Sequence, residues 1–172
     1  MTHEEVIQSK IHTIQSLQRQ LAIWRLHNKK IVFTNGCFDL LHRGHIDYLT
    51  KAADSGDYLV VAINSDDSVK LLNKGSSRPI QDEQSRAIIM ASLHFVSAII
   101  IFTENTPLEL IKQIEPNVLV KGSDYDMHEV NSQSEKYIVG SDFVRQQGGE
   151  VKTIEYLEGF STSDIEQKIK RS

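Results

Sequence analysis

The sequence predicts a doubly wound α/β domain, with a parallel five-stranded sheet, helices on both faces and an N-terminal helix packed on it. Five short apolar segments rich in β-branched residues alternate with helical segments. Right-handed crossovers between such strands place helices on both faces of the sheet. The chain has 172 residues, of which 40% are hydrophobic and 24% charged, which is typical of one domain. We therefore expect a single domain over 1–172, with 1–28 forming the N-terminal helix.

The first elements follow from local patterns. A helix is predicted from Glu4 to His27, because apolar residues recur there every three or four positions. Lys29 to Gly36 is a short apolar run that Asn-Gly stops, which indicates a buried strand. A second helix is predicted from Arg43 to Ala53, where Ser-Gly follows shortly after its end.

The alternation continues to the end of the sequence. The remaining strands are predicted at 58–63, 96–102, 117–120 and 150–154. The remaining helices are predicted at 65–72, 82–94, 107–114, 142–147 and 162–170. In such a sheet the ligand lies beyond the carboxyl ends of the strands, where the strand order reverses. The residues that follow each strand are therefore the candidates for a site.

Composition narrows the class of protein. The single cysteine, Cys37, excludes an internal disulfide framework and a Cys-based zinc cluster, and is typical of a reducing compartment. The net charge of −4 provides no overall basic field for nucleic acid. No apolar run reaches the roughly 18 residues that span a bilayer, and the N-terminus lacks the features of a signal peptide. We expect a cytoplasmic protein with neither nucleic acid nor membrane as a partner.

The segment after the first strand, Thr34 to His45, has the features of an anion site. Gly36 and Gly44 permit close approach of the backbone, and the following helix begins with unpaired N–H groups and a positive dipole end. His42 and His45 are three residues apart, so both imidazoles point to one side and are able to donate to a phosphate.

Other interpretations of the histidines are weaker. A single histidine at a helix start is most often a cap or a surface residue. A zinc site needs further ligands, and His94 and His128 lie in distant segments. The segment contains neither a Walker motif nor a Gly-x-Gly-x-x-Gly fingerprint.

The segment Thr34 to His45, read as TNGCFDLLHRGH, resembles the His-x-Gly-His signature of the cytidylyltransferase-like nucleotidyltransferases. Within that superfamily it is most similar to the heptose 1-phosphate adenylyltransferases, the ADP-heptose synthase domain. The resemblance covers nearly the whole chain and includes further segments in the same order: Asn64-Ser65-Asp66, Lys74-Gly75, Arg78-Pro79-Ile80, Arg86, Glu104-Asn105-Thr106-Pro107, Val120 to Tyr125, Gly148 to Val151 and Ser161-Thr162-Ser163. The family often has Gly-Gly-Asp-Tyr and Ser-Thr-Thr where this chain has Gly122-Ser123-Asp124-Tyr125 and Ser161-Thr162-Ser163, and both changes keep small or hydroxyl side chains.

The resemblance implies a Rossmann-like nucleotidyltransferase fold and a role for each matching residue. The implied catalytic residues are His42, His45 and Lys74. The implied nucleotide-binding residues are Thr34, Asn35, Gly36, Cys37, Phe38, Asp39, Gly44, Lys121, Gly122, Asp124, Ser161, Thr162 and Ser163. The implied substrate-binding residues are Asn64, Asp66, Arg78 and Arg86.

Physical reasoning leaves simpler alternatives open for several of these residues. Lysines and arginines most often lie on the solvated surface, yet Lys74, Arg78, Arg86 and Lys121 all fall on the side of the sheet where a ligand binds. Ser161 to Ser163 also reads as a helix N-cap, and a cap and a phosphate site are compatible.

The implied reaction transfers AMP from ATP to a sugar 1-phosphate, the family's substrate being D-glycero-D-manno-heptose 1-phosphate, and releases pyrophosphate. Mg²⁺ is expected as an ion carried by the nucleotide phosphates, with few protein ligands, and a homodimer or higher homo-oligomer is expected. Two alternatives remain: a CTP-dependent cytidylyltransferase for a small phosphorylated alcohol such as glycerol 3-phosphate, and a non-catalytic nucleotide-binding module.

Overall fold

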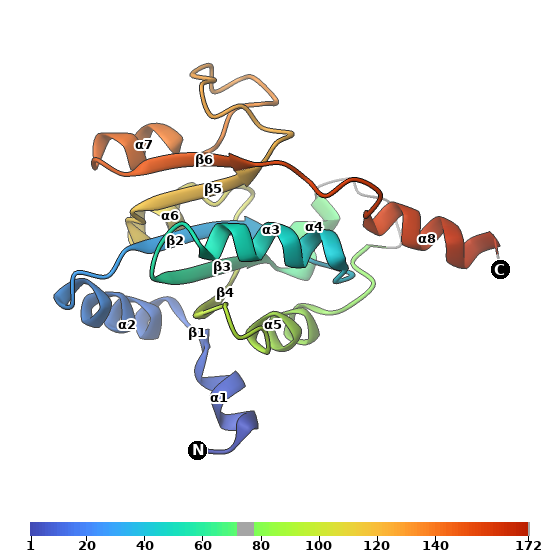
Figure 1. Cartoon of the computed structure of the whole chain (residues 1–172), viewed down its shortest axis with the longest axis horizontal. Coiled ribbons are helices and arrows are strands. Elements are labelled where there is room, and N and C mark those ends of the chain that lie inside the picture. The colour runs from blue at the N-terminus through green and yellow to red at the C-terminus, as the bar shows by residue number, and fades with distance from the viewer. Residues whose placement is uncertain (72–77, 172) are drawn as a thin grey trace.

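A computed structural model of the chain describes residues 1–71 and 78–171. Its centre is a parallel sheet of six strands in the order β1-β4-β3-β2-β5-β6 (Figure 1). The strands are β1 (Ile11–His12), β2 (Ile31–Gly36), β3 (Tyr58–Asn64), β4 (Ala98–Phe102), β5 (Val118–Gly122) and β6 (Glu150–Ile154). The predicted doubly wound α/β fold is confirmed, with one strand more than the five expected.

Helices cover both faces of this sheet. The helices are α1 (His3–Ser9), α2 (Ile14–Leu26), α3 (Arg43–Ala53), α4 (Asp66–Leu71), α5 (Glu83–Ala91), α6 (Leu108–Ile114), α7 (Ser141–Gln146) and α8 (Thr162–Arg171). Buried side chains of α2, α6 and α7 form one apolar cluster with the sheet. Those of α3 and α5 form a second cluster on the opposite face.

The strands divide their side chains between these clusters as pleating requires. In β3, Val60 and Ala62 belong to the first cluster, whereas Leu59, Val61 and Ile63 belong to the second. All five are at most 1% exposed. Burial on both faces explains why β3 reads as a continuous apolar run in the sequence.

The single N-terminal helix predicted from Glu4 to His27 is wrong. The chain leaves α1 at Lys10, forms the edge strand β1 beside β4, and begins α2 after Thr13, whose hydroxyl accepts from the backbone N–H of Ser16. Ile11 packs against the second cluster and Ile14 against the first. The two helices therefore pack against opposite faces of the sheet, which one straight helix cannot do.

The strand order reverses at β2, which pairs with β3 on one side and β5 on the other. Successive connections run from β2 through α3 to β3 and later return to β5 on the far side of β2. This is the arrangement in which a crevice opens at the carboxyl ends of the strands. The last helix, α8, begins near this edge and extends away from the sheet, and none of its residues is buried (Figure 1).

Candidate nucleotide-binding site

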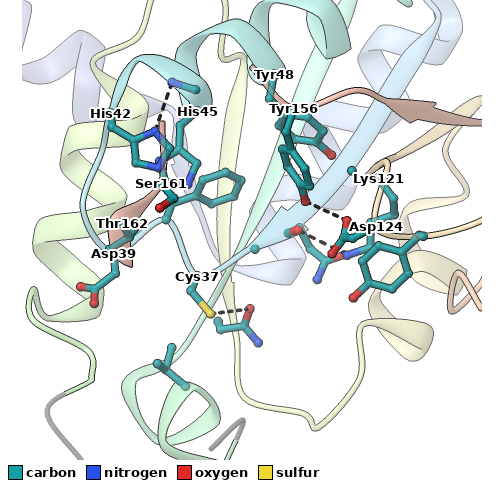
Figure 2. Close-up of a pocket in the computed structure, with 18 of the residues that line it drawn as sticks. Cys37, Asp39, His42, His45, Tyr48, Lys121, Asp124, Tyr156, Ser161 and Thr162 are labelled. Atoms are coloured by element: carbon teal, nitrogen blue, oxygen red, sulfur yellow. Dashed lines mark hydrogen bonds between the residues drawn. The ribbon is translucent and has the colours of Figure 1, made fainter. Parts of the chain in front are cut away.

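A pocket of about 840 Å³ opens at the carboxyl ends of β2, β3, β4 and β5 (Figure 2). Its lining comes from the β2–α3 loop, the segment after β5, the β6–α8 connection and the start of α8. Segments far apart in the sequence therefore meet at the edge where the strand order reverses. The volume is sufficient for a nucleotide-sized ligand.

The two histidines of the signature lie together at the start of α3. His42 is the N-cap residue, and its Nδ1 accepts from the backbone N–H of Gly44 at 3.1 Å. The rings of His42 and His45 stack with centroids 3.8 Å apart. A Cβ on Gly44 would lie 3.0 Å from the His42 ring, so glycine allows the ring to fold over the helix start.

Burial and the helix cap together determine the charge and the tautomer of the His42 ring. Burial lowers the pKa of His42 below its ordinary value, so the ring is neutral near pH 7. Because Nδ1 accepts the Gly44 N–H, the ring proton resides on Nε2. The ring is thereby a neutral hydrogen-bond donor beside a helix N-terminus, an arrangement suited to an anion.

Asp39 stabilises the conformation of the β2–α3 loop. Its carboxylate is 5% exposed and accepts from the backbone N–H groups of Ile80 and Gln81 and from the Arg78 guanidinium, each at 2.9 Å. Burial alone would raise the pKa of Asp39, but these donors together hold it below its ordinary value. A second arm of Arg78 contacts Glu166 at 3.1 Å, which ties α8 to the same loop.

On the other side of β2, Lys121 organises the pocket wall. Its Nζ donates to Asn35 Oδ1 at 2.9 Å and lies 5.0 Å from the ring centre of Tyr125. Because Oδ1 of Asn35 accepts from Lys121, the amide N–H₂ of Asn35 is the group left to face a ligand. The wall therefore presents donors and an aromatic surface side by side.

The start of α8 completes the pocket beside the histidines. Ser161, Thr162 and Ser163 line it, and Ser161 Oγ accepts from the backbone N–H of Asp164 at 3.1 Å. A Cβ on Gly44 would lie 3.2 Å from Phe160 Cβ, so the first turns of α3 and α8 are adjacent. Two helix N-termini thus face one cavity, which concentrates positive dipole ends there.

The comparison with known families decides the identity of this site. Residues 33–168 match the model of the cytidylyltransferase-like family. The chain belongs to the cytidylyltransferase-like family. It is therefore an enzyme of the nucleotidyltransferase class, as the His-x-Gly-His segment predicted. Its pocket lies at the carboxyl ends of the strands, where sheets of this type bind their ligands.

Curated relatives and solved structures agree with this membership. The chain is similar to the bifunctional protein HldE of Wolinella succinogenes, at 48% identity over 99% of this chain and 33% of the relative. It is similar to the HldE of Koribacter versatilis, at 50% identity over 95% of this chain and 32% of the relative. The chain thus spans about a third of the length of these relatives. Among solved structures, it resembles a lipopolysaccharide core biosynthesis protein from Thermoplasma volcanium, with a TM-score of 0.59, 28% identity, and coverage of 75% of this chain and 97% of that one.

A pantoate-beta-alanine ligase from Francisella tularensis, at 16% identity, shares the fold alone, with a TM-score of 0.59 over 93% of this chain and 76% of that one.

Most of the residues that the sequence predicted for this cytidylyltransferase-like site line the pocket. They are Asn35, Gly36, Cys37, Phe38, Asp39, His42, Gly44, His45, Asn64, Arg78, Lys121, Gly122, Asp124, Ser161, Thr162 and Ser163. Thr34 does not, because it is fully buried and its hydroxyl bonds to the hydroxyl of Tyr48 at 2.7 Å. Lys74 lies outside the described residues.

Arg86, which the resemblance implied as a substrate-binding residue on the ligand side of the sheet, does not line the pocket. Arg86 is 0% exposed, and its guanidinium donates to Gln81 O, Cys37 O and Asp66 Oδ1 at 3.0, 2.7 and 2.8 Å. Asp66 is likewise engaged with Arg86 and does not line the pocket. The spacing of apolar residues in α5 does not show whether a guanidinium such as that of Arg86 contacts a ligand or the backbone of a neighbouring loop.

The sequence reasoning assigned no role to four aromatic residues of the pocket. Tyr48, Tyr125, Tyr156 and Phe160 all line it. Tyr156 and Phe160 lie in the segment between β6 and α8, which follows the carboxyl end of a strand, so the rule that identified the other loops also applied here. Tyr48 gives no such signal, since its position reads as the packed face of α3.

Proposed function

We propose that the chain transfers AMP from ATP to a sugar 1-phosphate, specifically a heptose 1-phosphate, to give an ADP-sugar and pyrophosphate. The single observation that carries this proposal is that the His42–His45 pair and Ser161–Ser163 line one pocket side by side, each at a helix N-terminus. The triphosphate of a donor nucleotide carries negative charge along its length. Two neighbouring helix N-termini offer it a row of hydrogen-bond donors, which also stabilise the charge that develops when AMP is transferred.

The relatives and the signature segments together support the proposal. The chain aligns over almost its full length with proteins named HldE. It is 28% identical to the lipopolysaccharide core biosynthesis protein from Thermoplasma volcanium. Its signature segments resemble those of heptose 1-phosphate adenylyltransferases. The relatives are bifunctional by name and about three times as long as this chain.

In the proposed reaction a phosphate oxygen of the sugar 1-phosphate attacks the α-phosphorus of ATP, and the bond to the β-phosphate bridging oxygen breaks as pyrophosphate leaves. The attacking oxygen is already anionic, so no general base is needed. The chain therefore contributes alignment and charge stabilisation. The Nε2–H of His42, together with His45 and the start of α8, would donate to oxygens whose charge grows as pyrophosphate departs.

Mg²⁺ fits this pocket as an ion held by phosphate oxygens and water. The carboxylates among the described lining residues are Asp39 and Asp124. Asp39 accepts from three partners and Asp124 from Tyr156, so neither stands as an unengaged metal ligand. When bound with the nucleotide, Mg²⁺ would neutralise part of the phosphate charge.

The test measures pyrophosphate release from ATP, CTP and GTP with a panel of sugar 1-phosphates and with glycerol 3-phosphate. We expect release with ATP and heptose 1-phosphate, and its loss in His45→Ala made in parallel to exclude a contaminating enzyme. A higher kcat/KM with CTP for every acceptor would assign the chain to the cytidylyltransferases instead. Absence of turnover with every pair, in a protein that binds nucleotide, would indicate a non-catalytic module.

We also propose that the protein acts in the cytoplasm, as its single cysteine suggests, and forms a homodimer or larger homo-oligomer, which sedimentation would test. In the part of the chain that the structure describes, no helix has the length and apolar character needed to cross a membrane.

A further inference from the structure

Tyr156 reaches from the β6–α8 connection into the pocket and contacts Asp124 (Figure 2). Its hydroxyl donates to Asp124 Oδ1 at 2.9 Å. Burial, together with the neighbouring Asp124 carboxylate, raises the pKa of Tyr156, so the phenol keeps its proton and acts as a donor. An ionised carboxylate only accepts hydrogen bonds. A ligand group that replaces the Tyr156 hydroxyl beside Asp124 must therefore be a donor.

The phenol lies directly on the backbone of Gly122. A Cβ on Gly122 would lie 1.9 Å from the Tyr156 hydroxyl oxygen and 2.7 Å from Asp124 Oδ1. The space that glycine leaves open at the carboxyl end of β5 is therefore filled by the end of the tyrosine ring. Such an open backbone surface is where a ligand approaches most closely.

The tyrosine is held in this position lightly. Its side chain belongs to a residue that is 55% exposed, in a connection without regular structure between Ile154 and Thr162. Besides the Asp124 carboxylate, the phenol contacts the backbone of Gly122, and its ring centre lies 6.2 Å from that of Tyr48. A ligand that supplies its own donor to Asp124 can replace the phenol without breaking the packed core.

The surroundings match a nucleoside. Tyr48, Tyr125 and Tyr156 gather beside Gly122 and Asp124, and flat aromatic surfaces suit a base. The phosphate donors of α3 and α8 line the same pocket on its other side. A nucleotide whose phosphates reach those helix starts would place its nucleoside beside Asp124.

We propose that Tyr156 is a specificity-determining residue that holds Asp124 in the ligand-free protein as a stand-in for a hydrogen-bond donor of the nucleoside. Nucleoside binding displaces the phenol, and Asp124 then accepts from a ribose hydroxyl or an exocyclic amino group. A nucleoside without that donor leaves Asp124 to the phenol and is disfavoured. This inference rests on the proposed nucleotide-binding function and adds the group that selects the nucleoside.

The test is calorimetric binding of ATP with Mg²⁺ and without any acceptor. Tyr156→Phe removes the competing hydrogen bond but keeps the ring, so we expect the Kd for ATP to fall about three- to tenfold. The matched control is Tyr137→Phe, because Tyr137 donates to Asp142 at 3.0 Å in the same kind of pair outside the pocket lining. Its Kd should equal that of the unaltered protein.

Two further measurements identify the donor. Asp124→Asn should raise the Kd and remove the gain from Tyr156→Phe when the two are combined. 2′-Deoxy-ATP, 3′-deoxy-ATP and ITP each lack one candidate donor, and the analogue that lacks the relevant one should show no gain in Tyr156→Phe.

An unchanged or raised Kd for ATP in Tyr156→Phe, with normal thermal unfolding, would overturn the inference while leaving the proposed function intact. Absence of ATP binding by the unaltered protein would overturn the proposed function and this inference with it.

Discussion

The guanidinium of Arg86 donates to the backbone carbonyl of Cys37 at 2.7 Å, which links the interior of α5 to the loop that lines the nucleotide pocket. Arg86 is fully buried, and its other donors reach Gln81 O and Asp66 Oδ1. Asp39, in the same loop, accepts from the backbone of Ile80 and Gln81. Arg86 of α5 therefore holds the signature loop by a backbone carbonyl, and Asp39 of that loop holds the backbone of the segment before α5.

Arg86→Lys is expected to lower the free energy of unfolding by about 2 to 4 kcal/mol. A lysine ammonium cannot reach all three acceptors of the guanidinium fork, so buried carbonyl oxygens lose their partners. Urea unfolding followed by circular dichroism measures the change. Arg19→Lys, on the exposed surface of α2, is the control and should leave stability unaltered. Equal stability of both variants and the unaltered protein would show that Arg86 does not hold the loop.

Asp39→Asn is expected to destabilise the protein by about 2 kcal/mol at pH 7, and by less in acid. The folded-state pKa of Asp39 is lowered, so it lies below the unfolded value of about 3.9. The contribution of the carboxylate is then complete above that value and disappears as the pH falls through the folded pKa.

Urea unfolding of both proteins between pH 7 and pH 3 tests this dependence. The difference between them should narrow below about pH 4. Asp67→Asn, at an exposed ion pair with Lys70, is the control. A difference that stays constant with pH would contradict the role assigned to the charged form of Asp39.

The sequence was sufficient for five of the six strands and for most of the pocket lining, because both depend on local patterns. Buried parallel strands are short apolar runs, and glycine with histidine just after β2 marks the phosphate side. Arg86 and Thr34 were misplaced because burial of a polar side chain depends on partners contributed by distant segments. Tyr156 follows the carboxyl end of β6, where the rule for ligand-binding loops applies, but the sequence alone does not show that its side chain turns toward Asp124. The break at Lys10 was missed because the apolar spacing continues through it while its side chains change faces of the sheet.

Cys37 is expected to react with a maleimide more slowly when nucleotide is bound. It is the single cysteine of the chain, it lines the pocket, and its Sγ lies 3.8 Å from Asn64 Oδ1. Mass spectrometry of the labelled protein with and without ATP and Mg²⁺ gives the two rates. The same rate at saturating ATP would place the nucleotide away from the β2–α3 loop.

Replacement of His42 or His45 by alanine is expected to reduce kcat by about a hundredfold or more, with a smaller change in nucleotide affinity. Donors that act on charge developing in the transition state have effects of this size. His94→Ala, at an exposed position before β4, is the control and should retain full activity. Near-native kcat in His45→Ala would remove the histidine pair from the catalytic machinery.

The most direct measurement is a competition in one vessel, with equal concentrations of ATP and CTP, Mg²⁺ and D-glycero-D-manno-heptose 1-phosphate in each anomeric form. Mass spectrometry identifies the nucleotide sugar that accumulates. We predict the mass of ADP-heptose, formed with one pyrophosphate per product and at least about a hundredfold more slowly when His45→Ala replaces the unaltered enzyme. Accumulation of CDP-heptose, or of no nucleotide sugar from either anomer, would contradict the assignment of the chain as a heptose 1-phosphate adenylyltransferase.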